Sequence, residues 1–198
     1  MNIALFGSSA DPPTVGHKAI IEWLGQKFDL CVIWVSNNPF KSHQASMEQR
    51  LEMVRRMIAE INNAHPDRPN IELHPEISSP RSLFTVQQAQ QIWPDATFHL
   101  VVGSDIVPQL HSWYHANQLL NLVNLLIVPR QGYALSEQDL EALRIRRATF
   151  AIANIGVPQV SSSAYRECDD DSGIVSSVAE YIHQEHLYEW QEARPVSP

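Results

Sequence analysis

The sequence contains few of the residues that define several large classes of protein. Its two cysteines, Cys31 and Cys168, lack metal-ligand spacing, and we interpret both as reduced thiols rather than as a disulfide framework. No apolar run reaches the ~18–20 residues that a membrane-spanning helix needs. The N-terminus enters an apolar segment directly, without a basic region or a signal-peptide core. We therefore expect a cytoplasmic protein with no membrane partner.

Positive charge is also scarce. Fourteen Lys and Arg residues, only three of them lysines, face 22 Asp and Glu residues, which gives a formal net charge of −8. This balance argues against a nucleic-acid partner, because such proteins carry a basic face. It does not exclude a nucleotide substrate, whose binding depends on a few local donors. The length of 198 residues and the hydrophobic content of 44% fit a domain with a substantial core.

Apolar runs alternate with segments of helical periodicity along the chain. The runs predict buried strands at 3–6, 30–35, 98–102, 125–128 and 149–152, with a short strand at 71–73. The periodic segments predict helices at 15–28, 47–61, 85–93, near 119–123, at 136–144 and at 175–186. This alternation predicts an α/β fold, a doubly wound parallel sheet in three α/β/α layers. We expect a single domain over residues 1–190 and a frayed tail over 191–198.

Ligands of such a sheet bind where the strands end, and the first strand ends in a distinctive segment. Small residues, Gly7, Ser8 and Ser9, separate the strand from a helix that opens near Gly16 and His17. Free N–H groups and the positive end of the helix dipole would bind phosphate there. Taken alone, a turn of small residues is common, and a histidine early in a helix is more often a solvated or capping residue.

The joint pattern is more specific. It resembles the nucleotidyltransferase signature Gly-x-x-x-Asp-Pro-x-(His or Thr)-x-Gly-His, which matches Gly7, Asp11, Pro12, Thr14, Gly16 and His17. Thr14 stands where many members have the first histidine. A threonine can donate a hydrogen bond to a phosphate, but it carries no positive charge.

The segment after the second strand, Asn37 to Lys41 followed by Arg50, is similar to the corresponding segment of nicotinate-mononucleotide adenylyltransferases. The resemblance implies that Lys41 reaches the mononucleotide or the triphosphate. Loop cations are usually only solvated. Phe40 replaces a histidine that the family often has, and the interval to Arg50 is short, so the role of Arg50 stays open.

Further motifs resemble the same family. Gly103-Ser104-Asp105 follows a strand, Trp113 lies among polar residues, and Arg130 lies in the run 128–133. The resemblance implies that Asp105 and Arg130 serve ATP and that Trp113 packs on the pyridine ring. From the residues alone, Ser104 or Asp105 is equally well interpreted as a helix N-cap.

The resemblance also implies how the pyridine carboxylate is bound. Its donors would be backbone N–H groups near Phe84 and Thr85, at a predicted helix start, and near Trp113 and Tyr114. No Lys or Arg is an evident partner for the carboxylate. We therefore expect a limited preference for nicotinate over nicotinamide.

The serine run 161–163, followed by Arg166, resembles the family motif Ile-Ser-Ser-(Thr or Ser)-x-x-Arg. Hydroxyls and a guanidinium on one helical turn suit a triphosphate, although serines that open a helix are ordinarily caps. The tail pattern formed by Val178, Tyr181, Leu187 and Tyr188 is similar to the C-terminus of the family.

The resemblance implies an enzyme that joins ATP and nicotinate mononucleotide into nicotinate adenine dinucleotide and pyrophosphate, with Mg²⁺ accompanying ATP. The predicted catalytic residues are His17, Thr14, Lys41 and Arg166. The predicted ATP-binding residues are Gly7, Ser8, Ser9, Gly16, His17, Gly103, Asp105, Arg130, Ser162, Ser163 and Arg166. The predicted mononucleotide-binding residues are Lys41, Phe84, Thr85, Trp113 and Tyr114. No all-protein metal cage is expected, because phosphates and water hold most of the ion.

Three alternatives remain open. The first is an enzyme for nicotinamide mononucleotide or for both mononucleotides. The second is phosphopantetheine adenylyltransferase, which is usually shorter and lacks the features at Trp113 and 128–133. The third is a non-catalytic nucleotide-binding regulator, against which the joint presence of His17, Lys41 and Arg166 argues. The sequence is compatible with a homo-oligomer but specifies no oligomeric state.

Overall fold

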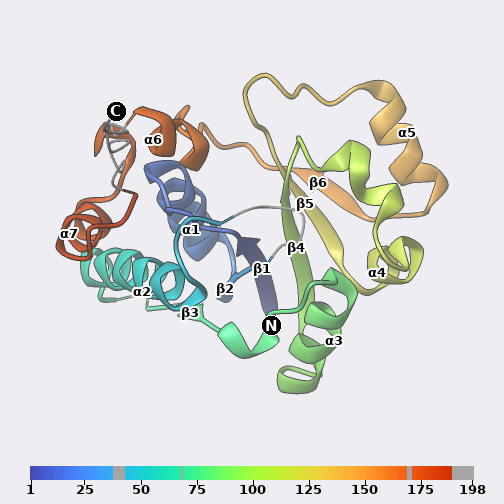
Figure 1. Ribbon diagram of the computed structural model, residues 1–198. Helices are drawn as coiled ribbons and strands as arrows, with labels where there is room; N and C mark the ends of the chain where they lie inside the picture. Colours follow the sequence, from blue (N-terminus) through green and yellow to red (C-terminus); the bar gives the residue numbers. More distant parts are fainter. Residues whose placement is uncertain (38–42, 68, 169–170, 189–198) are drawn as a thin grey trace.

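The computed structural model describes the chain except for residues 38–42, 68, 169–170 and 189–198. Six parallel strands form one sheet in the order β3-β2-β1-β4-β5-β6 (Figure 1). The strands are β1 (Asn2–Ser8), β2 (Leu30–Val35), β3 (Ile71–Leu73), β4 (Thr97–Gly103), β5 (Asn124–Val128) and β6 (Phe150–Ile152). The predicted doubly wound parallel sheet is confirmed.

Helices connect the strands and cover both faces of the sheet. The α-helices are α1 (Val15–Lys27), α2 (Met47–Ala64), α3 (Ser82–Ile92), α4 (Ala116–Leu122), α5 (Glu137–Ile145), α6 (Ser162–Cys168) and α7 (Ser176–Gln184). Three short 3₁₀ helices are η1 (Pro75–Ile77), η2 (Val107–Ser112) and η3 (Asp171–Gly173). Within the described part of the chain, no helix combines the length and the apolarity needed to cross a membrane.

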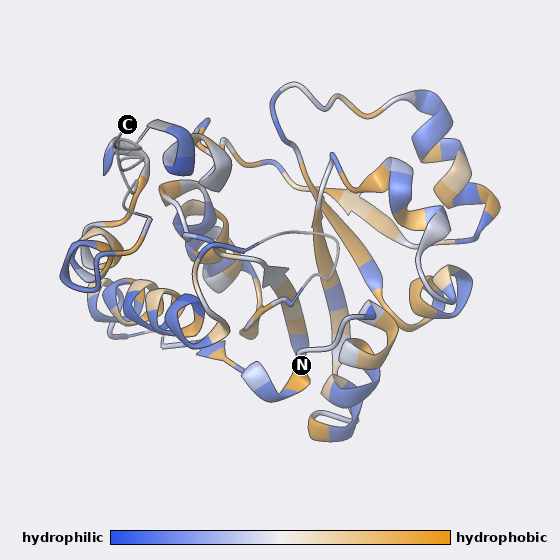
Figure 2. Cartoon of the chain, viewed as in Figure 1, coloured by the Kyte–Doolittle hydropathy of each residue, from blue (hydrophilic) through white to orange (hydrophobic). Residues whose placement is uncertain are grey.

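Alternation along β1 divides the core into two clusters. Ala4 and Phe6 pack into one cluster, whereas Ile3 and Leu5 pack into the other, because successive strand side chains point to opposite faces. The helices α1, α2, α6 and α7 cover the first cluster, and α3, α4 and α5 cover the second (Figure 1). Figure 2 shows the matching pattern, with orange strands between helices that mix orange and blue.

The topology brings the candidate site to one edge of the sheet. From β1 the chain runs outward to β2 and β3, then returns to place β4 on the other side of β1. The carboxyl ends of β1 and β4 are therefore neighbours at the point where the strand order reverses, which is the usual ligand crevice of an open α/β sheet.

Several predicted helix details differ from the structure. Helix α3 begins at Ser82, not near Thr85. The sequence does not reveal this start, because the N-cap residue, Arg81, makes no side-chain capping hydrogen bond. In α1, Ile21, Leu24 and Gly25 are buried, while Ile20 is only partly buried. The predicted tail, 191–198, lies outside the described residues.

Candidate active site

The turn between β1 and α1 holds His17 from both sides. Thr14 is the N-cap of α1: its Oγ1 accepts from the backbone N–H of His17 at 3.5 Å, and its own N–H donates to His17 Nδ1 at 3.1 Å. Since a backbone N–H can only donate, Nδ1 is an acceptor, and we assign the proton of the neutral ring to Nε2. His17 Nε2 lies 2.8 Å from Ser8 Oγ, at the carboxyl end of β1.

The Thr14 hydroxyl is directed at His17. Thr14 Oγ1 lies 2.8 Å from His17 Nδ1, and only 1% of the residue is exposed. The sequence assigned Thr14 to the triphosphate, whereas the structure places its hydroxyl in a reciprocal cap with His17. A capping threonine of this kind fixes the ring orientation of the histidine.

Gly7 is required by packing between β1 and β2. A Cβ at Gly7 would lie 2.2 Å from Cε2 of Trp34, which no side chain can accommodate without displacing the indole. At Gly16 the nearest atoms are 3.4 Å away, an ordinary contact. Gly7 therefore lets the Trp34 indole pack directly against the backbone of β1, in addition to its place in the small-residue turn.

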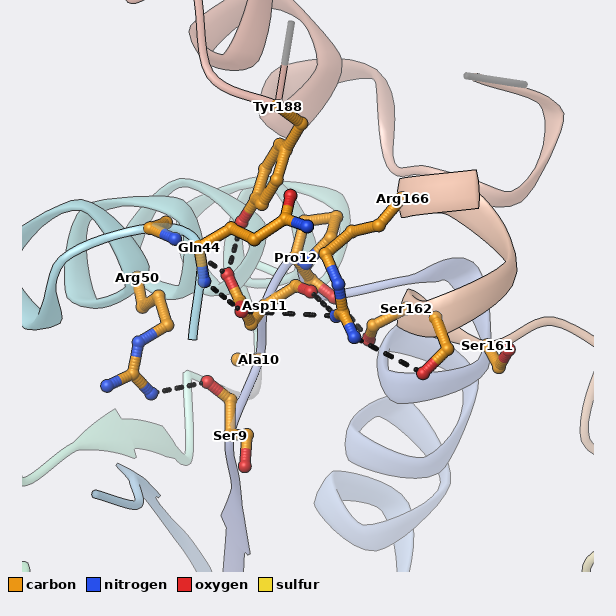
Figure 3. A network of polar contacts seen from close by, with 12 residues as sticks. Ser9, Ala10, Asp11, Pro12, Gln44, Arg50, Ser161, Ser162, Arg166 and Tyr188 are labelled. Atoms are coloured by element: carbon orange, nitrogen blue, oxygen red, sulfur yellow. Dashed lines mark hydrogen bonds and ion pairs between the residues drawn. The ribbon is translucent and has the colours of Figure 1, made fainter. Parts of the chain in front are cut away.

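Asp11 is the centre of a polar network that joins distant segments of the chain (Figure 3). Its carboxylate is 3% exposed and accepts from the backbone N–H groups of Gln44, at 2.9 Å, and Ala45, at 3.2 Å. Tyr188 donates its hydroxyl proton to Asp11 Oδ1 at 2.7 Å. Arg166 Nη1 donates to the main-chain carbonyl of Asp11 and lies 3.9 Å from Oδ2.

The predicted serine–arginine motif meets the β1–α1 turn from the far end of the sequence. Ser162 Oγ donates to the carbonyl of Pro12 at 2.7 Å, across 150 residues of chain. Arg166 Nη2 donates to Ser163 Oγ at 3.3 Å on the same helix. Ser161 has the capping role, since its Oγ accepts from the N–H of Ala164 at 3.1 Å. The motif thus lies beside His17's turn, with Ser163 exposed.

The structure answers the question left open at Arg50. This side chain is 2% exposed, and its Nη1 donates to the carbonyl of Ser9 at 2.7 Å (Figure 3). The same Nη1 also donates to the carbonyl of Ser36 at 3.0 Å. Burial lowers its pKa, although the nearby charge of Asp11 opposes that shift. Arg50 therefore ties together the segments that follow β1 and β2. Lys41 lies outside the described residues.

Asp105 and Arg130 pair with each other at the end of β4. Arg130 Nη1 lies 3.0 Å from Asp105 Oδ2, and the backbone N–H of Arg130 donates to Ser104 Oγ at 2.9 Å. The N-cap interpretation of Ser104 and Asp105 is wrong: the helix that follows, η2, starts at Val107 without a side-chain cap. Asp105 follows β4 and Arg130 follows β5, so both predicted ATP residues lie at the carboxyl ends of neighbouring strands.

The four predicted mononucleotide residues that the structure describes, Phe84, Thr85, Trp113 and Tyr114, lie on α3 and on the segment joining η2 to α4. The rings of Phe84 and Tyr114 lie 5.6 Å apart and are 40% and 41% exposed, while Trp113 is partly buried on the second core cluster. The Thr85 side chain is 1% exposed, and its Oγ1 has no hydrogen-bond partner among the residues that the structure describes. An unpartnered buried hydroxyl is costly unless a ligand or water satisfies it.

The expected backbone donors at this place are not free. The N–H groups of Phe84 and Thr85 both donate to the carbonyl of Arg81, at 2.9 and 3.3 Å. They lie within the first turns of α3 because the helix begins at Ser82, earlier than the sequence indicated. That backbone N–H groups near Phe84 and Thr85, and near Trp113 and Tyr114, bind the carboxylate stays a prediction, although the first two are hydrogen-bonded within α3 in this structure.

Arg81 is a residue that the sequence did not single out. Its guanidinium lies 3.9 Å from the centre of the Tyr114 ring and 6.0 Å from that of Phe84. No carboxylate within the described ranges forms an ion pair with it. The sequence carried no signal for this contact, because Arg81 and Tyr114 belong to different elements that meet only on folding.

The chemistry of the donor set suits an anion rather than a bound cation. Around the β1–α1 turn the side chains are hydroxyls, an imidazole and a guanidinium, and the one carboxylate, Asp11, already accepts from three donors. Among the described residues no group of three or more His, Cys, Asp or Glu side chains is arranged to hold a metal ion. Phosphate groups are the ligands that such donors fit.

Comparison with known proteins agrees with this geometry. The family model described as Cytidylyltransferase-like matches residues 5–168, and the chain belongs to this family of nucleotidyltransferases. A curated relative from Synechocystis, named "Probable nicotinate-nucleotide adenylyltransferase", is 39% identical over 95% of this chain and 99% of its own. Another of the same name, from Gemmatimonas aurantiaca, is 34% identical over 67% of this chain and 63% of its own. Within the family, the chain groups with the nicotinate-nucleotide adenylyltransferases.

Solved structures show the same fold at lower identity. The Plasmodium falciparum nicotinic acid mononucleotide adenylyltransferase complexed with NaAD has a TM-score of 0.79 and 20% identity, covering 94% of this chain and 97% of its own. The same Plasmodium enzyme complexed with APC gives a TM-score of 0.76.

Proposed function

We propose that this protein is an adenylyltransferase that joins ATP and nicotinate mononucleotide, giving nicotinate adenine dinucleotide and pyrophosphate. The proposal rests on two motifs that suit phosphate binding, the β1–α1 turn and the serine–arginine motif, which are far apart in the sequence but lie together in the structure. Ser162 and Arg166, on α6, are hydrogen-bonded to the turn that holds His17, at the carboxyl end of β1. A relative that is similar over 95% of the chain carries the corresponding name.

The reaction needs no protein nucleophile, because the phosphate of the mononucleotide is already ionised and can attack the α-phosphorus of ATP directly. Catalysis then consists of positioning and of stabilising the charge that develops. The His17 Nε2–H, which now meets Ser8, is the donor placed to bind an α-phosphate oxygen. Arg166 and Ser163 would hold the triphosphate, and the bond between the α- and β-phosphates would break to release pyrophosphate.

Mg²⁺ would arrive as part of the ATP substrate. The carboxylate in the turn, Asp11, already accepts from three hydrogen-bond donors, so the metal's ligands would be phosphate oxygens and water. The ion would neutralise part of the triphosphate charge. The free, buried thiol of Cys31 is consistent with our further proposal that the reaction takes place in the cytoplasm.

The preference for the acid over the amide has a structural basis at Arg81. A guanidinium beside two exposed aromatic rings suits a flat ring that carries a carboxylate: the ring would stack on the aromatic side chains and direct its carboxylate at the guanidinium. Nicotinate offers that carboxylate and nicotinamide does not.

The test is pyrophosphate release from ATP and Mg²⁺, with nicotinate mononucleotide, nicotinamide mononucleotide or phosphopantetheine offered separately. We expect the highest kcat/KM with nicotinate mononucleotide and no release with phosphopantetheine. Faster turnover of nicotinamide mononucleotide would contradict the acid preference alone. Release only with phosphopantetheine, or with no acceptor offered, would overturn the proposal.

A further inference from the structure

Tyr188 belongs to a sequence motif that the proposed mechanism does not use. It is the last described residue before the chain's final segment, and it reaches Asp11 across 177 residues of sequence. Its ring meets that of Tyr165 edge-on, with centroids 5.8 Å apart. Burial, the hydrogen bond to Asp11 and the charge of Asp11 all raise the pKa of its hydroxyl, so the group remains a proton donor.

Helix α7 anchors this contact. Val178 and Ile182 of α7 are buried in the first core cluster, and Tyr181 packs against Arg56 of α2 with the guanidinium 4.7 Å from the ring centre. The backbone N–H of Leu187 donates to the carbonyl of Ile182 at 3.0 Å, which closes the turn after the helix. The position of the Tyr188 hydroxyl is thus determined by packing far from the β1–α1 turn.

The hydroxyl completes the donor shell of a buried carboxylate. The Asp11 oxygens accept from two backbone N–H groups, of Gln44 and Ala45, and from Tyr188 (Figure 3). Arg166 contacts the carbonyl of Asp11, yet its Nη1 is 3.9 Å from Oδ2, beyond hydrogen-bond distance. The hydrogen bonds to the Asp11 carboxylate therefore come from neutral donors. The Arg166 guanidinium lies next to Asp11 and donates to Ser163 Oγ.

Without the Tyr188 hydroxyl, Asp11 Oδ1 would lose a donor in a site that water scarcely enters. A buried carboxylate short of a partner attracts a neighbouring cation strongly, and Arg166 Nη1 lies 3.9 Å from Asp11 Oδ2. A guanidinium drawn fully onto Asp11 would have fewer N–H groups left for an incoming triphosphate.

We propose that Tyr188 is a positioning residue for triphosphate binding, acting through Asp11 to hold the Arg166 guanidinium available for ATP. This inference rests on the proposed function in one respect, since it takes Arg166 to be a triphosphate ligand. It assigns a role in ATP binding to a tyrosine near the C-terminus, whose hydroxyl donates to Asp11, a residue outside the predicted ATP-binding set.

The test is the variant Tyr188→Phe, which keeps the ring on Tyr165 and removes only the hydroxyl. Losing a hydrogen bond to a charged group typically weakens an interaction by about tenfold or more, so we expect the KM for ATP to rise by about tenfold. We expect kcat and the KM for nicotinate mononucleotide to stay within about twofold, because the change acts on the triphosphate ligand. Tyr181→Phe is the matched control, since it removes a hydroxyl from the same C-terminal segment without touching Asp11.

A second measurement does not depend on turnover. Inorganic tripolyphosphate, titrated calorimetrically into the intact chain, probes the anion site alone, and Tyr188→Phe should weaken its binding by a similar factor. In an Arg166→Ala background, Tyr188→Phe should produce no further weakening, because the two residues act on one contact. This double variant separates positioning from a general loss of stability.

Each possible result of these measurements either supports or overturns the inference. Unchanged tripolyphosphate affinity with a lowered melting temperature would show that Tyr188 only stabilises the fold, and it would overturn the inference. Additive losses in the double variant, or no tripolyphosphate binding by the unmodified protein, would also overturn it. If the protein makes no dinucleotide but Tyr188→Phe still weakens tripolyphosphate in an Arg166-dependent manner, then the inference stands and the proposed function fails.

Discussion

At the scale of single residues, His17 is held at three atoms by two neighbours. Its backbone N–H and its Nδ1 meet Thr14, and its Nε2 meets Ser8. The ring is therefore oriented before any substrate arrives, and binding would exchange one hydroxyl contact for a phosphate contact. Such preorganisation is the main source of electrostatic catalysis.

The first prediction follows from that orientation. His17→Ala should lower kcat by about 10²–10⁴, the range for one positioned catalytic or charge-stabilising group. The fold should persist, because Thr14 still accepts from the backbone N–H at position 17. Steady-state kinetics at saturating substrates, with circular dichroism as the folding control, would measure this. A variant with near-full turnover would remove His17 from the mechanism.

The second prediction concerns Arg81. Arg81→Ala should raise the KM for nicotinate mononucleotide by up to about fivefold, since an exposed ion pair contributes about 0.2–1 kcal/mol. The KM for nicotinamide mononucleotide should change much less, and Arg81→Lys should restore part of the preference. Arg55→Ala, on the exposed face of α2, is the control. Equal losses for both mononucleotides would show that Arg81 only supports the aromatic rings.

At the scale of elements, the corner between β3 and η1 contains a histidine between two carboxylates. His74 Nε2 lies 2.9 Å from Glu72, and its Nδ1 lies 2.6 Å from Glu76. Burial lowers the pKa of His74, but the hydrogen bonds and charges of the two carboxylates outweigh it, so the pKa is raised. The ring also meets Trp93 edge-on at 5.0 Å, a contact that does not need its charge.

The third prediction is a pH dependence of stability at this corner. A raised folded-state pKa means that the charged pair stabilises the protein fully below the unfolded value, near 6.5, and that this contribution disappears as pH rises through the folded value. His74→Asn should therefore cost about 1 kcal/mol more at pH 5.5 than at pH 9, since half-exposed partners limit the gain. Urea unfolding at both pH values measures the difference. A penalty that grows with pH would contradict the sign.

At the scale of the whole molecule, the first and last parts of the chain meet at one place. The turn containing Asp11 and Pro12 contacts Ser162, Arg166 and Tyr188, so the candidate ATP site exists only when both ends are folded together. Arg50 adds a second tie, between the segments that follow β1 and β2.

The fourth prediction belongs to this junction. Arg166→Ala should raise the KM for ATP by about one to two decades, because a charged donor to phosphate contributes roughly 1.5–3 kcal/mol. Arg144→Ala, on the exposed side of α5, should leave both KM values unchanged. Measuring the two KM values separately is decisive: a rise confined to nicotinate mononucleotide would assign Arg166 to the other substrate.

Much of the fold was predictable because its signals are local. The strands that became β1, β2, β4 and β5 are continuous apolar runs, as expected for strands buried on both faces. The start of α3 was not predictable, since Arg81 provides no side-chain cap. The earlier start places Phe84 and Thr85 inside the first turn of α3, where their N–H groups donate to the carbonyl of Arg81.

The sequence by itself determined the parallel α/β architecture, the phosphate-type turn and the family, because each depends on residues within about twenty positions of one another. Only the tertiary structure decided how the polar side chains are paired. Arg50 lies buried between two carbonyls, Arg81 lies on Tyr114, and Tyr188 holds Asp11. These partners are far apart in the chain, and a buried polar group takes whichever donor or acceptor the packing brings within hydrogen-bond distance.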